Sequence, residues 1–535
     1  MKQLGARPCG DEVVEFRVWA PRPAEVRLQL RDSELSLEHA GEGFYEVVAP
    51  VQAGDDYRFV LDGKPWPDAA SRWQPKGIRG PSRVLAPERV EPLEDPPARD
   101  ELVIYELHVG TFTPEGTFEA AIPYLRELAE LGVTAIELMP VAEFPGQRGW
   151  GYDGVYISAA QSSYGGPLGL AKLVSGAHRA GLAVILDVVY NHIGTSGIEA
   201  FDAFGPYFTD QHETPWGRAI NYDQAGSGAV REWVLQSATG WIRDFGIDGL
   251  RLDAIHSIYD SGPEHIVAAI ARRVHAERPG AAVIGEIGLD DPRQHGAPAC
   301  DAIWVDDFHH SLHVLLTGER DGYYAEFGRV QQLAEAYRHP PPERFVVFAQ
   351  NHDQVGNRAF GDRMPHELQP LAAFCTLLAP STPLLFMGEE YGEPAAFQFF
   401  SDHIDEEIAV ATRAGRRREF AAFAEFAHQE VPDPQDPATF ERSKLTRHRD
   451  ETLASLYSEL LRVRRELPPG VPDAIDWDED ERWLKVRRGN FMLVMNFSDR
   501  ELVLAGAGAR LRLATSPATT LTSVAPVSGA LLEGA

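Results

Sequence analysis

Cysteine is scarce in this chain of 535 residues, which has only three: Cys9, Cys300 and Cys375. An odd number of cysteines at such wide spacing excludes a disulfide framework and gives no zinc-binding pattern. Cys375 lies in an apolar, helix-like stretch, where a thiol usually fills core space. Scarce cysteine is typical of a reducing compartment, so we expect a cytoplasmic protein.

Long apolar runs are also absent. No stretch reaches the roughly 18 apolar residues that a membrane-spanning helix needs. Residues 1–10 lack the apolar core of a secretory signal peptide. Internal repeats and low-complexity tracts are absent as well. We therefore expect no membrane partner.

Positive charge is in deficit. The 50 Lys and Arg residues stand against 80 Asp and Glu residues, which gives a net charge of -30. Such a field repels nucleic acid and anionic membranes, so we expect neither as a partner. A neutral ligand such as a sugar is compatible with it, although acidity alone identifies none.

The chain is too long for one hydrophobic core and predicts about two to four domains. Residues 1–90 alternate apolar and polar side chains between Gly and Pro, which is typical of a small β-sandwich. After a Pro-rich linker, residues 91–465 predict the largest domain. Residues 466–535 return to strand-like alternation and predict a second β-sandwich. The long connection at 193–229 predicts a short inserted subdomain beside the functional site.

Strand-like and helix-like segments alternate in the central domain. Amphipathic helices fit between the strands, for example at 118–131, 168–180, 230–245 and 262–277. Eight such repeats predict a closed (β/α)₈ barrel, the TIM barrel of the α/β class. A doubly wound open sheet is the alternative, but no Gly-rich phosphate turn follows the first strand. The strand candidates are 102–108, 133–139, 183–189, 249–253, 282–286, 302–305, 345–349 and 383–387.

Three carboxylates follow buried strand candidates: Asp253, Glu286 and Asp353. Barrel enzymes keep their chemistry at the carboxyl ends of their strands. Two carboxylates and a helper are what glycosidic bond cleavage requires. A chain with 80 acidic residues will place some at strand ends by chance. Three of them, each flanked by His, Arg or Asn, argue against chance.

The surroundings of these acids suggest their roles in the retaining reaction. Arg251 lies two positions before Asp253, so on a strand both side chains face the same side. A nearby cation keeps a carboxylate ionised, which favours Asp253 as the nucleophile. A structural ion pair is the other interpretation of these two residues. Glu286 has no cation beside it in sequence, so burial would raise its pKa, as a proton donor requires. Asp353 would hold sugar hydroxyls and stabilise the transition state.

Further candidates surround these acids. Asp187, at the end of the third strand, is expected to orient Arg251, and His192 and His352 are expected to donate to sugar hydroxyls. Tyr152 follows the second strand and could stack on a sugar ring or simply pack in the core. His256 closes the segment that contains Asp253. A metal site at His192 is disfavoured, because no set of acids accompanies it at a ligand-like spacing.

The chain resembles the α-amylase superfamily of glycoside hydrolases. Residues 187–192, 249–253, Glu286 and 351–353 are similar to its four sequence regions, in order. The resemblance implies Asp253 as nucleophile, Glu286 as acid/base and Asp353 as transition-state stabiliser. It also implies that Tyr152, His192, Arg251 and His352 lie around the attacked sugar. Residues 16–21 resemble part of the N-terminal, carbohydrate-binding-like sandwich of its branching and debranching members.

A narrower resemblance is to the malto-oligosyltrehalose trehalohydrolase family. It rests on residues 306–313, 317–319, 322–324, 387–391, 400–403, 415–420 and 432–437. It implies cleavage of the α-1,4 bond next to the terminal trehalose of maltooligosyl trehalose. The wall of the trehalose site would come from the loops after strands six to eight. The residues expected there are Phe308, His309, His310, Glu390, Phe400, Asp402 and His403.

Two other functions stay open at this point. A glycogen-branching enzyme or another α-1,4-glucan-acting enzyme of the superfamily would use the same carboxylates. A glucan-binding protein without activity is disfavoured, because Arg251 and all three acids are present. The segment after strand three lacks the acids of calcium-dependent amylases, so we expect no required metal and no cofactor. We expect a monomer.

Overall fold

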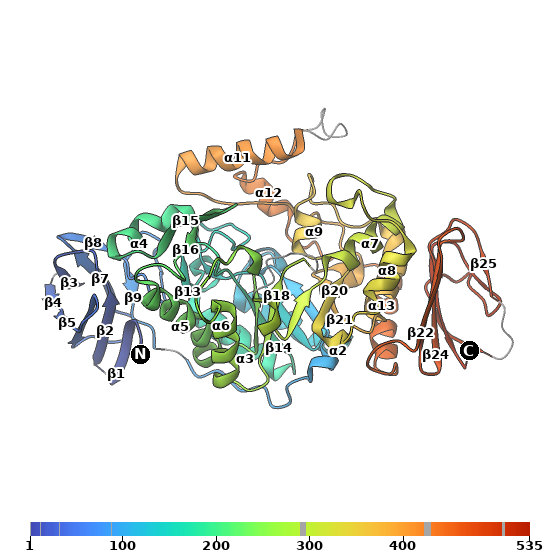
Figure 1. The fold of residues 1–535 in the computed structure, drawn as a ribbon, viewed down its shortest axis with the longest axis horizontal. Helices are drawn as coiled ribbons and strands as arrows, with labels where there is room; N and C mark the ends of the chain where they lie inside the picture. The colour runs from blue at the N-terminus through green and yellow to red at the C-terminus, as the bar shows by residue number, and fades with distance from the viewer. Residues whose placement is uncertain are drawn as a thin grey trace.

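The computed structural model describes residues 2–534, apart from residues 11, 32, 87, 289–295, 422–429 and 505–508. A closed barrel lies between an N-terminal β-sandwich and a C-terminal β-domain, as Figure 1 shows. The predicted fold class is therefore confirmed. No helix among the described residues is long and apolar enough to cross a membrane.

Eight parallel strands form the barrel, and the last pairs with the first. All eight strand candidates are confirmed, with ends that differ from the predicted ones by up to two residues. Each strand is followed by a helix or a helical segment, which makes the parallel arrangement possible. The strands are β10 (Ile104–Leu107), β11 (Ala135–Leu138), β14 (Ala183–Val188), β17 (Gly249–Leu252), β18 (Ala282–Glu286), β19 (Ala302–Trp304), β20 (Phe345–Phe348) and β21 (Thr382–Phe386).

Amphipathic helices cover the outside of the barrel. In α2 (Phe118–Leu131), Phe118, Ala121, Leu125 and Leu128 are buried at helical spacing. Thr117 caps its start, and Gly132 ends it in the left-handed conformation that favours glycine. The other covering helices are α3 (Gly166–Arg179), α5 (Ser227–Phe245), α6 (Ile266–Glu277), α7 (Asp306–Thr317), α8 (Val330–Ala336), α10 (Gln369–Leu377) and α13 (Glu451–Arg464).

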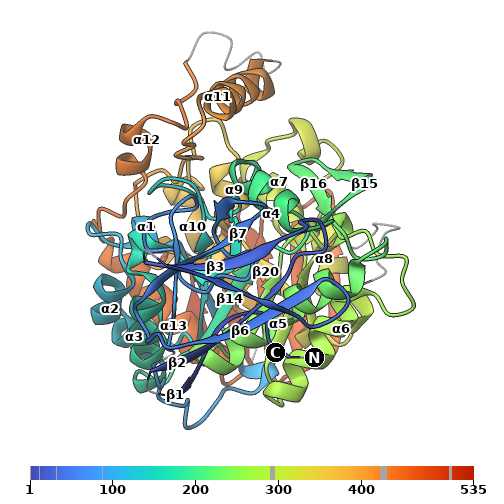
Figure 2. The ribbon, with the colours of Figure 1, turned by 90° about the vertical axis from the view of Figure 1, so that its left-hand side faces the viewer.

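The N-terminal sandwich has two antiparallel sheets, seen face-on in Figure 2. In β3 (Val26–Leu30) alternate residues are buried, as the sequence pattern predicts. One sheet has the order β1–β2–β6–β5 and the other the order β4–β3–β7–β8, with β9 paired to β7. The remaining strands are β1 (Gly5–Gly10), β2 (Val13–Trp19), β4 (Ser33–Ser36), β5 (Glu38–His39), β6 (Phe44–Ala49), β7 (Asp56–Leu61), β8 (Lys64–Trp66) and β9 (Ser82–Arg83).

The C-terminal domain packs a five-stranded sheet against a two-stranded one. β23 (Trp483–Arg488) buries every second residue, and apolar residues of both sheets share one cluster. The five-stranded sheet has the order β22–β23–β24–β28–β26. The strands are β22 (Ala474–Asp478), β24 (Phe491–Asn496), β25 (Leu502–Val503), β26 (Arg510–Ala514), β27 (Ser523–Val524) and β28 (Ser528–Glu533).

Several smaller elements gather at the carboxyl ends of the barrel strands, which face upward in Figure 1. The connection after β14 contains α4 (Ile198–Phe204) and a hairpin of β15 (Phe208–Thr214) and β16 (Gly217–Ile220). The other elements of these connections are α1 (Val109–Phe112), β12 (Ala142–Glu143), β13 (Tyr156–Ala160), α9 (His352–Gly356), α11 (Glu406–Ala421) and α12 (Pro437–Arg442).

Candidate active site

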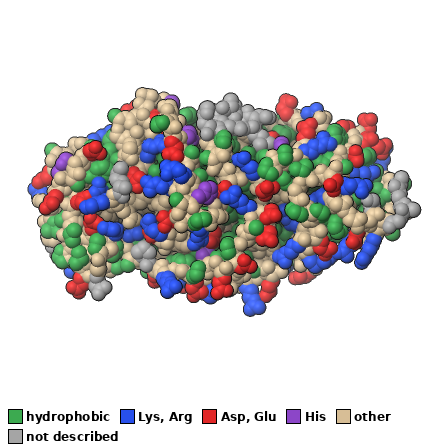
Figure 3. Space-filling model, turned by 60° about the horizontal axis from the view of Figure 1, so that its bottom comes forward, with side chains coloured by type: hydrophobic (Ala, Val, Ile, Leu, Met, Phe, Trp, Pro, Cys, Tyr) green, Lys and Arg blue, Asp and Glu red, His purple; other side chains and the backbone are tan. Residues whose placement is uncertain are grey.

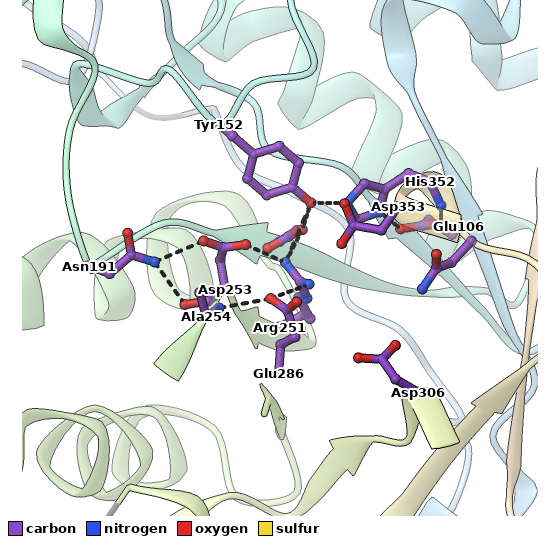
Figure 4. Close-up of polar contacts among 12 residues, drawn as sticks. Glu106, Tyr152, Asn191, Arg251, Asp253, Ala254, Glu286, Asp306, His352 and Asp353 are labelled. Atoms are coloured by element: carbon purple, nitrogen blue, oxygen red, sulfur yellow. Dashed lines mark hydrogen bonds and ion pairs between the residues drawn. The ribbon is translucent and has the colours of Figure 1, made fainter. Parts of the chain in front are cut away.

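Asp253, Glu286 and Asp353 lie at the same end of the barrel, as Figure 4 shows. Asp253 directly follows β17, Glu286 is the last residue of β18, and Asp353 lies in α9, which begins four residues after β20 ends. The charge of Glu286 acts on both Asp253 and Asp353 and raises the pKa of each. The structure thus brings the three predicted carboxylates together.

Arg251 is the cation at the centre of this cluster. Its guanidinium is fully buried and lies 2.7 Å from Asp187 Oδ2, 3.0 Å from Asp253 Oδ1 and 2.7 Å from Glu286 Oε2. Arg251 and Asp253 share one side of β17, as their spacing predicts. The guanidinium also lies over the ring of Trp304, 4.3 Å from its centroid. Buried charges need such partners, so the three acids and the arginine stabilise one another.

The backbone after Asp253 adopts a conformation that supports Glu286. Ala254 has a φ of +40°, in the left-handed region that residues other than glycine rarely adopt. In this conformation its N–H donates to Glu286 Oε2 at 2.8 Å. Asn191 Nδ2 donates to Asp253 Oδ2, also at 2.8 Å. Local strain of this kind persists where surrounding contacts hold it, as they do at functional sites.

Asp253 and Glu286 differ in proton affinity. Burial and the charge of Glu286 raise the pKa of Asp253 well above its ordinary value, against the charge of Arg251. Burial also acts to raise the pKa of Glu286, but the charge of Arg251 and the N–H of Ala254 outweigh it and lower that pKa. The pKa values of these two interacting carboxyls are therefore shifted in opposite directions in the free protein. The prediction that Glu286 has no neighbouring cation is wrong, because Arg251 lies 2.7 Å away.

A chain of buried hydrogen bonds leads to Asp353. His352 Nδ1 lies 2.5 Å from Glu106 Oε1, and its Nε2 lies 2.7 Å from Tyr152 OH, which donates to Asp187 Oδ2 at 2.6 Å. His352 Nε2 is also 3.4 Å from Asp353 Oδ1. Burial acts to lower the pKa of His352, but the charges of Asp353 and Glu106 outweigh it and raise that pKa to about 10. His352 is therefore a cation at neutral pH that donates from both nitrogens.

An exposed tryptophan lies beside the site. The ring of Trp216, in the turn between β15 and β16, stacks on the ring of His192 with centroids 5.5 Å apart. Its side chain is 49% exposed, which leaves an aromatic surface open to a ligand. Burial lowers the pKa of His192 to about 4, so this ring is neutral. The sequence reasoning predicted His192 but missed Trp216. Its signal was an aromatic residue within the long inserted connection.

Two further residues lie near Glu286: His256, which the sequence predicted, and Asp306, which it did not. The charge of His256 acts to lower the pKa of Glu286, so this predicted residue belongs to the cluster. Asp306, which begins α7 after β19, was missed. Burial and the charges of Glu286 and Asp353 raise its pKa to about 7, and Gln354 Nε2 donates to it at 3.2 Å. Its position after a barrel strand is the same signal that identified the other acids.

A cavity of about 940 Å³ lies beside α9, with Gln354 and Val355 of this helix in its wall. His309, Tyr323 and Arg358 belong to its wall. His309 is buried, with its ring nitrogens 2.7 Å from Ala349 O and 3.0 Å from Tyr324 OH. His310, on the next position of α7, is partly exposed and packs on Tyr323 with ring centroids 5.2 Å apart. Phe308 is buried within the core.

Asp402 and His403 lie against the loop that carries Tyr152. Asp402 accepts hydrogen bonds from Arg148 Nη2 at 2.7 Å and from the N–H of Gln147 at 2.8 Å. His403 Nε2 lies 3.9 Å from Asp153 Oδ2. Both predicted residues therefore lie at the border of the site, where they contact residues that precede or follow Tyr152 in the sequence.

Glu390 and Phe400 are not brought to the cluster. Glu390 is buried, and its two oxygens accept hydrogen bonds from Tyr105 OH at 3.0 and 3.1 Å. Phe400 is buried against the rings of His108, Phe397 and Phe440. The chain after β21 turns these two side chains into the core and away from the three carboxylates.

No group of three or more His, Cys, Asp or Glu side chains among the described residues is arranged to hold a metal ion. The acids of the site instead have Arg251 and His352 as their cations. Activity without a bound metal stays a prediction.

The fold and the site define a glycoside hydrolase of the α-amylase class. Residues 98–213 match the family model of the alpha-amylase catalytic domain, and residues 474–531 match a domain of unknown function, DUF3459. The chain is 35% identical to a candidate alpha amylase of Salmonella typhimurium, whose crystal structure aligns over 100% of both chains with a TM-score of 0.90.

Within this class the chain belongs to the malto-oligosyltrehalose trehalohydrolase family. It is 41% identical over 534 residues to the malto-oligosyltrehalose trehalohydrolase of Saccharolobus solfataricus, and the match covers 93% of each chain. A 1,4-alpha-glucan branching enzyme of Nitratidesulfovibrio vulgaris is more distant, at 29% identity over 73% of this chain and 71% of its own.

Proposed function

We propose that this protein hydrolyses the α-1,4 bond next to the terminal trehalose of maltooligosyl trehalose and releases trehalose. The observation that carries the chemistry is the contact of one guanidinium, that of Arg251, with both Asp253 and Glu286. The substrate comes from the family, whose name describes this reaction. Cytoplasmic location, a monomeric state and domain boundaries near residues 90 and 465 stay predictions from the sequence.

The proposed roles follow from position and charge. Asp253 attacks the anomeric carbon, Glu286 protonates the leaving oxygen, and Asp353 stabilises the positive charge of the transition state. Because one guanidinium contacts both Asp253 and Glu286, the two carboxylates are close together. This favours the retaining reaction, whose carboxylates lie about 5–5.5 Å apart, over the inverting reaction, which needs room for a water molecule.

In the free protein the two pKa shifts run opposite to what the reaction needs, because Glu286 must carry a proton and Asp253 must be ionised. We propose that a bound glucan oxygen draws Glu286 away from Ala254 N–H and Arg251. Burial, the largest influence on this carboxyl, then raises its pKa. Asp253 keeps the hydrogen bonds from Arg251 and Asn191 that support its charge.

The substrate would extend to both sides of the three carboxylates. Tyr152, His192 and His352 surround the position of the attacked sugar, and Trp216 offers an exposed aromatic surface beside it. On the other side, Asp306, His309 and His310 are candidates for contacts with trehalose. Buried polar groups that pair with trehalose hydroxyls would reject a sugar that leaves them unpaired.

Product chromatography tests the proposal. Maltotriosyl trehalose and maltopentaose are incubated separately with the protein. Free trehalose and maltotriose from the first, with little attack on the second, is the expected result. Comparable cleavage of both substrates would contradict the trehalose specificity. Longer or branched products without new reducing ends would indicate a branching enzyme instead.

Removal of Glu286's charge is expected to lower the pKa of Asp253. The charge of Glu286 is one of the causes that raise it, so the Glu286→Gln variant loses that cause. With an α-glucosyl fluoride, which needs no acid catalyst, the variant should become active at lower pH than the wild type, because the nucleophile must be ionised. An unchanged acid limb in the pH–rate profile would contradict the coupling of the two groups.

Trp216→Ala is expected to raise KM by about tenfold, which corresponds to about 1.4 kcal/mol of lost contact. The value of kcat should change little, because the ring touches no catalytic carboxylate. Steady-state kinetics on maltotriosyl trehalose measures both, with Trp216→Phe as the matched variant that keeps an aromatic surface. An unchanged KM in the alanine variant would remove Trp216 from the substrate path.

A further inference from the structure

A second large cavity lies at the opposite end of the barrel from the carboxylates. Its volume is about 1260 Å³, and its wall includes Val103, Thr134, Arg344 and Pro380, which precede β10, β11, β20 and β21. The linker before β10 runs along this underside (Figure 1). Figure 3 shows the same side, where basic and acidic side chains are interspersed. The cavity is therefore separate from the proposed active site.

Three arginines belong to this wall: Arg464 and Arg465 at the end of α13, and Arg488 at the end of β23. No ion pair joins any of the three to a carboxylate in the part of the chain that the structure describes. Burial and the charge of Arg488 lower the pKa of Arg464 to about 9. Burial lowers the pKa of Arg488 to about 10. Two neighbouring, desolvated guanidinium groups without a counter-ion are unfavourable.

Backbone capping accounts for part of this arrangement. Arg464 donates to Leu377 O, Ala379 O and Ser381 O, and Arg488 donates to Leu378 O and Pro468 O. Most of these carbonyls lie at or just after the end of α10, where a cation is favourable.

These hydrogen bonds to backbone carbonyls leave some N–H donors of Arg464 and Arg488 without a partner. Two guanidinium groups carry about ten N–H donors, and the contacts above use half of them. Arg488 is 5% exposed, and its buried Nε has no hydrogen-bond partner. The side chain of Arg465 is exposed and has no hydrogen-bond or ion-pair partner among the described residues. An oxyanion with several acceptor oxygens would satisfy these donors and the charge together.

The acidic residues of the cavity wall do not act as counter-ions for these three arginines. Asp301 pairs with Arg99 at 2.7 Å. Asp100, Glu101 and Glu343 also line the cavity, but none forms an ion pair with the three arginines. The arginine side of the cavity is therefore positively charged, in a protein whose net charge is -30.

We infer that this cavity binds a phosphate group, as inorganic phosphate or as a phosphate monoester of a small metabolite, through Arg464, Arg465 and Arg488. The geometry of guanidinium groups suits phosphate oxygens, and the volume exceeds that of a free phosphate. The site is at the other end of the barrel from Asp253, so its ligand does not compete with the glucan.

Isothermal titration calorimetry on the full-length protein tests this inference. Inorganic phosphate, glucose 6-phosphate and AMP are titrated separately, without glucan. Saturable binding of one molecule per chain is expected. Equal affinity for all three identifies the phosphate group as the ligand, and an affinity at least tenfold higher for one monoester identifies its organic part as a contact. No saturable binding up to about 10 mM, a very weak affinity, would overturn the inference.

The variants are chosen so that folding is preserved. Arg465→Ala removes an exposed side chain with no protein partner, and it should weaken binding at least tenfold. Arg488→Lys keeps the charge but loses the forked donor geometry, and it should weaken binding as well. Arg462→Ala is the matched control on the same helix, because Arg462 pairs with Glu459 and Glu466 and does not line the cavity.

Two further results would count against the inference. Equal loss of binding in Arg462→Ala and Arg465→Ala would mean nonspecific attraction by surface charge. Competitive inhibition of glucan hydrolysis by the bound ligand would place it in the active site instead. The comparison of Arg462→Ala with Arg465→Ala does not depend on the proposed reaction, since binding is measured without the glucan.

Discussion

Asp253→Ala is expected to lower kcat on maltotriosyl trehalose by about 10⁴-fold or more, because the variant lacks the group that attacks the anomeric carbon. Asp353 and Glu286 cannot replace it, since each has its own position and partners around the sugar. The fold should persist, because Asp253 lies at the mouth of the barrel and Asn191 keeps its hydrogen bond to the backbone carbonyl of residue 253. Steady-state kinetics measures the loss, and circular dichroism checks the fold.

Azide rescue separates the roles of the two carboxylates. In Asp253→Ala, azide enters on the face that Asp253 occupied, so an α-glycosyl substrate should give a β-glycosyl azide. In Glu286→Ala, Asp253 still forms the β-linked glycosyl-enzyme, and azide replaces water in the second step to give an α-glycosyl azide. These configurations follow from one inversion in the first variant and two in the second. Exchanged configurations would mean that the roles of the two residues are exchanged.

The barrel and its acids could be predicted because they depend on local pattern. Each of the eight strands is a short apolar run, and parallel strands in a barrel bring their carboxyl ends to one face. That rule alone placed Asp253, Glu286 and Asp353 at one end of the molecule. The spacing of Arg251 and Asp253 then gave their shared direction on β17.

Contacts between strands could not be predicted in this way. Arg251 reaches Glu286 from the neighbouring strand, which reversed the expected direction of the Glu286 pKa shift. The left-handed conformation of Ala254, which supplies the N–H to Glu286, has no sequence signal, because alanine does not favour it. Asp306 follows a strand of three residues and was passed over.

The residues after β21 show a second limit of predicting a site from the carboxyl ends of barrel strands. Being near the end of a strand fixes which face of the barrel a residue is near, but not whether its side chain points to solvent or core. The short turn that contains Glu390 directs it to Tyr105, and Phe400 packs among aromatic rings. Asp402, two residues further on, lies at the edge of the site. Only the course of the backbone distinguishes these cases.

Arg251→Met is expected to lower kcat/KM by about 10³-fold or more and to destabilise the protein. The substitution leaves Asp187, Asp253 and Glu286 without the cation that each contacts. Breaking a buried ion pair costs about 3–5 kcal/mol, because the remaining charge stays desolvated. Asp253 would then lose the partner that supports its ionised form, which a nucleophile requires.

The loss of stability in Arg251→Met is expected to depend on pH in a definite direction. The charge of Arg251 acts to lower the pKa of all three carboxyls, so the variant raises the already high pKa values of Asp187 and Asp253 further and removes the main cause of the low pKa of Glu286. An acid whose folded pKa lies above its unfolded value stabilises the fold at low pH, and this stability is lost as pH rises through the folded pKa. The difference in Tm between wild type and Arg251→Met should therefore increase from about pH 4 upward, beyond the ordinary carboxyl pKa.

Arg231→Met is the matched control, because Arg231 also pairs with a fully buried carboxylate, that of Asp260, but lies outside the cluster. It should lower Tm while kcat/KM stays near the wild-type value. If both variants lose activity equally, Arg251 acts through stability alone. If only Arg251→Met loses activity, the reaction depends on the one buried cation that contacts both carboxylates.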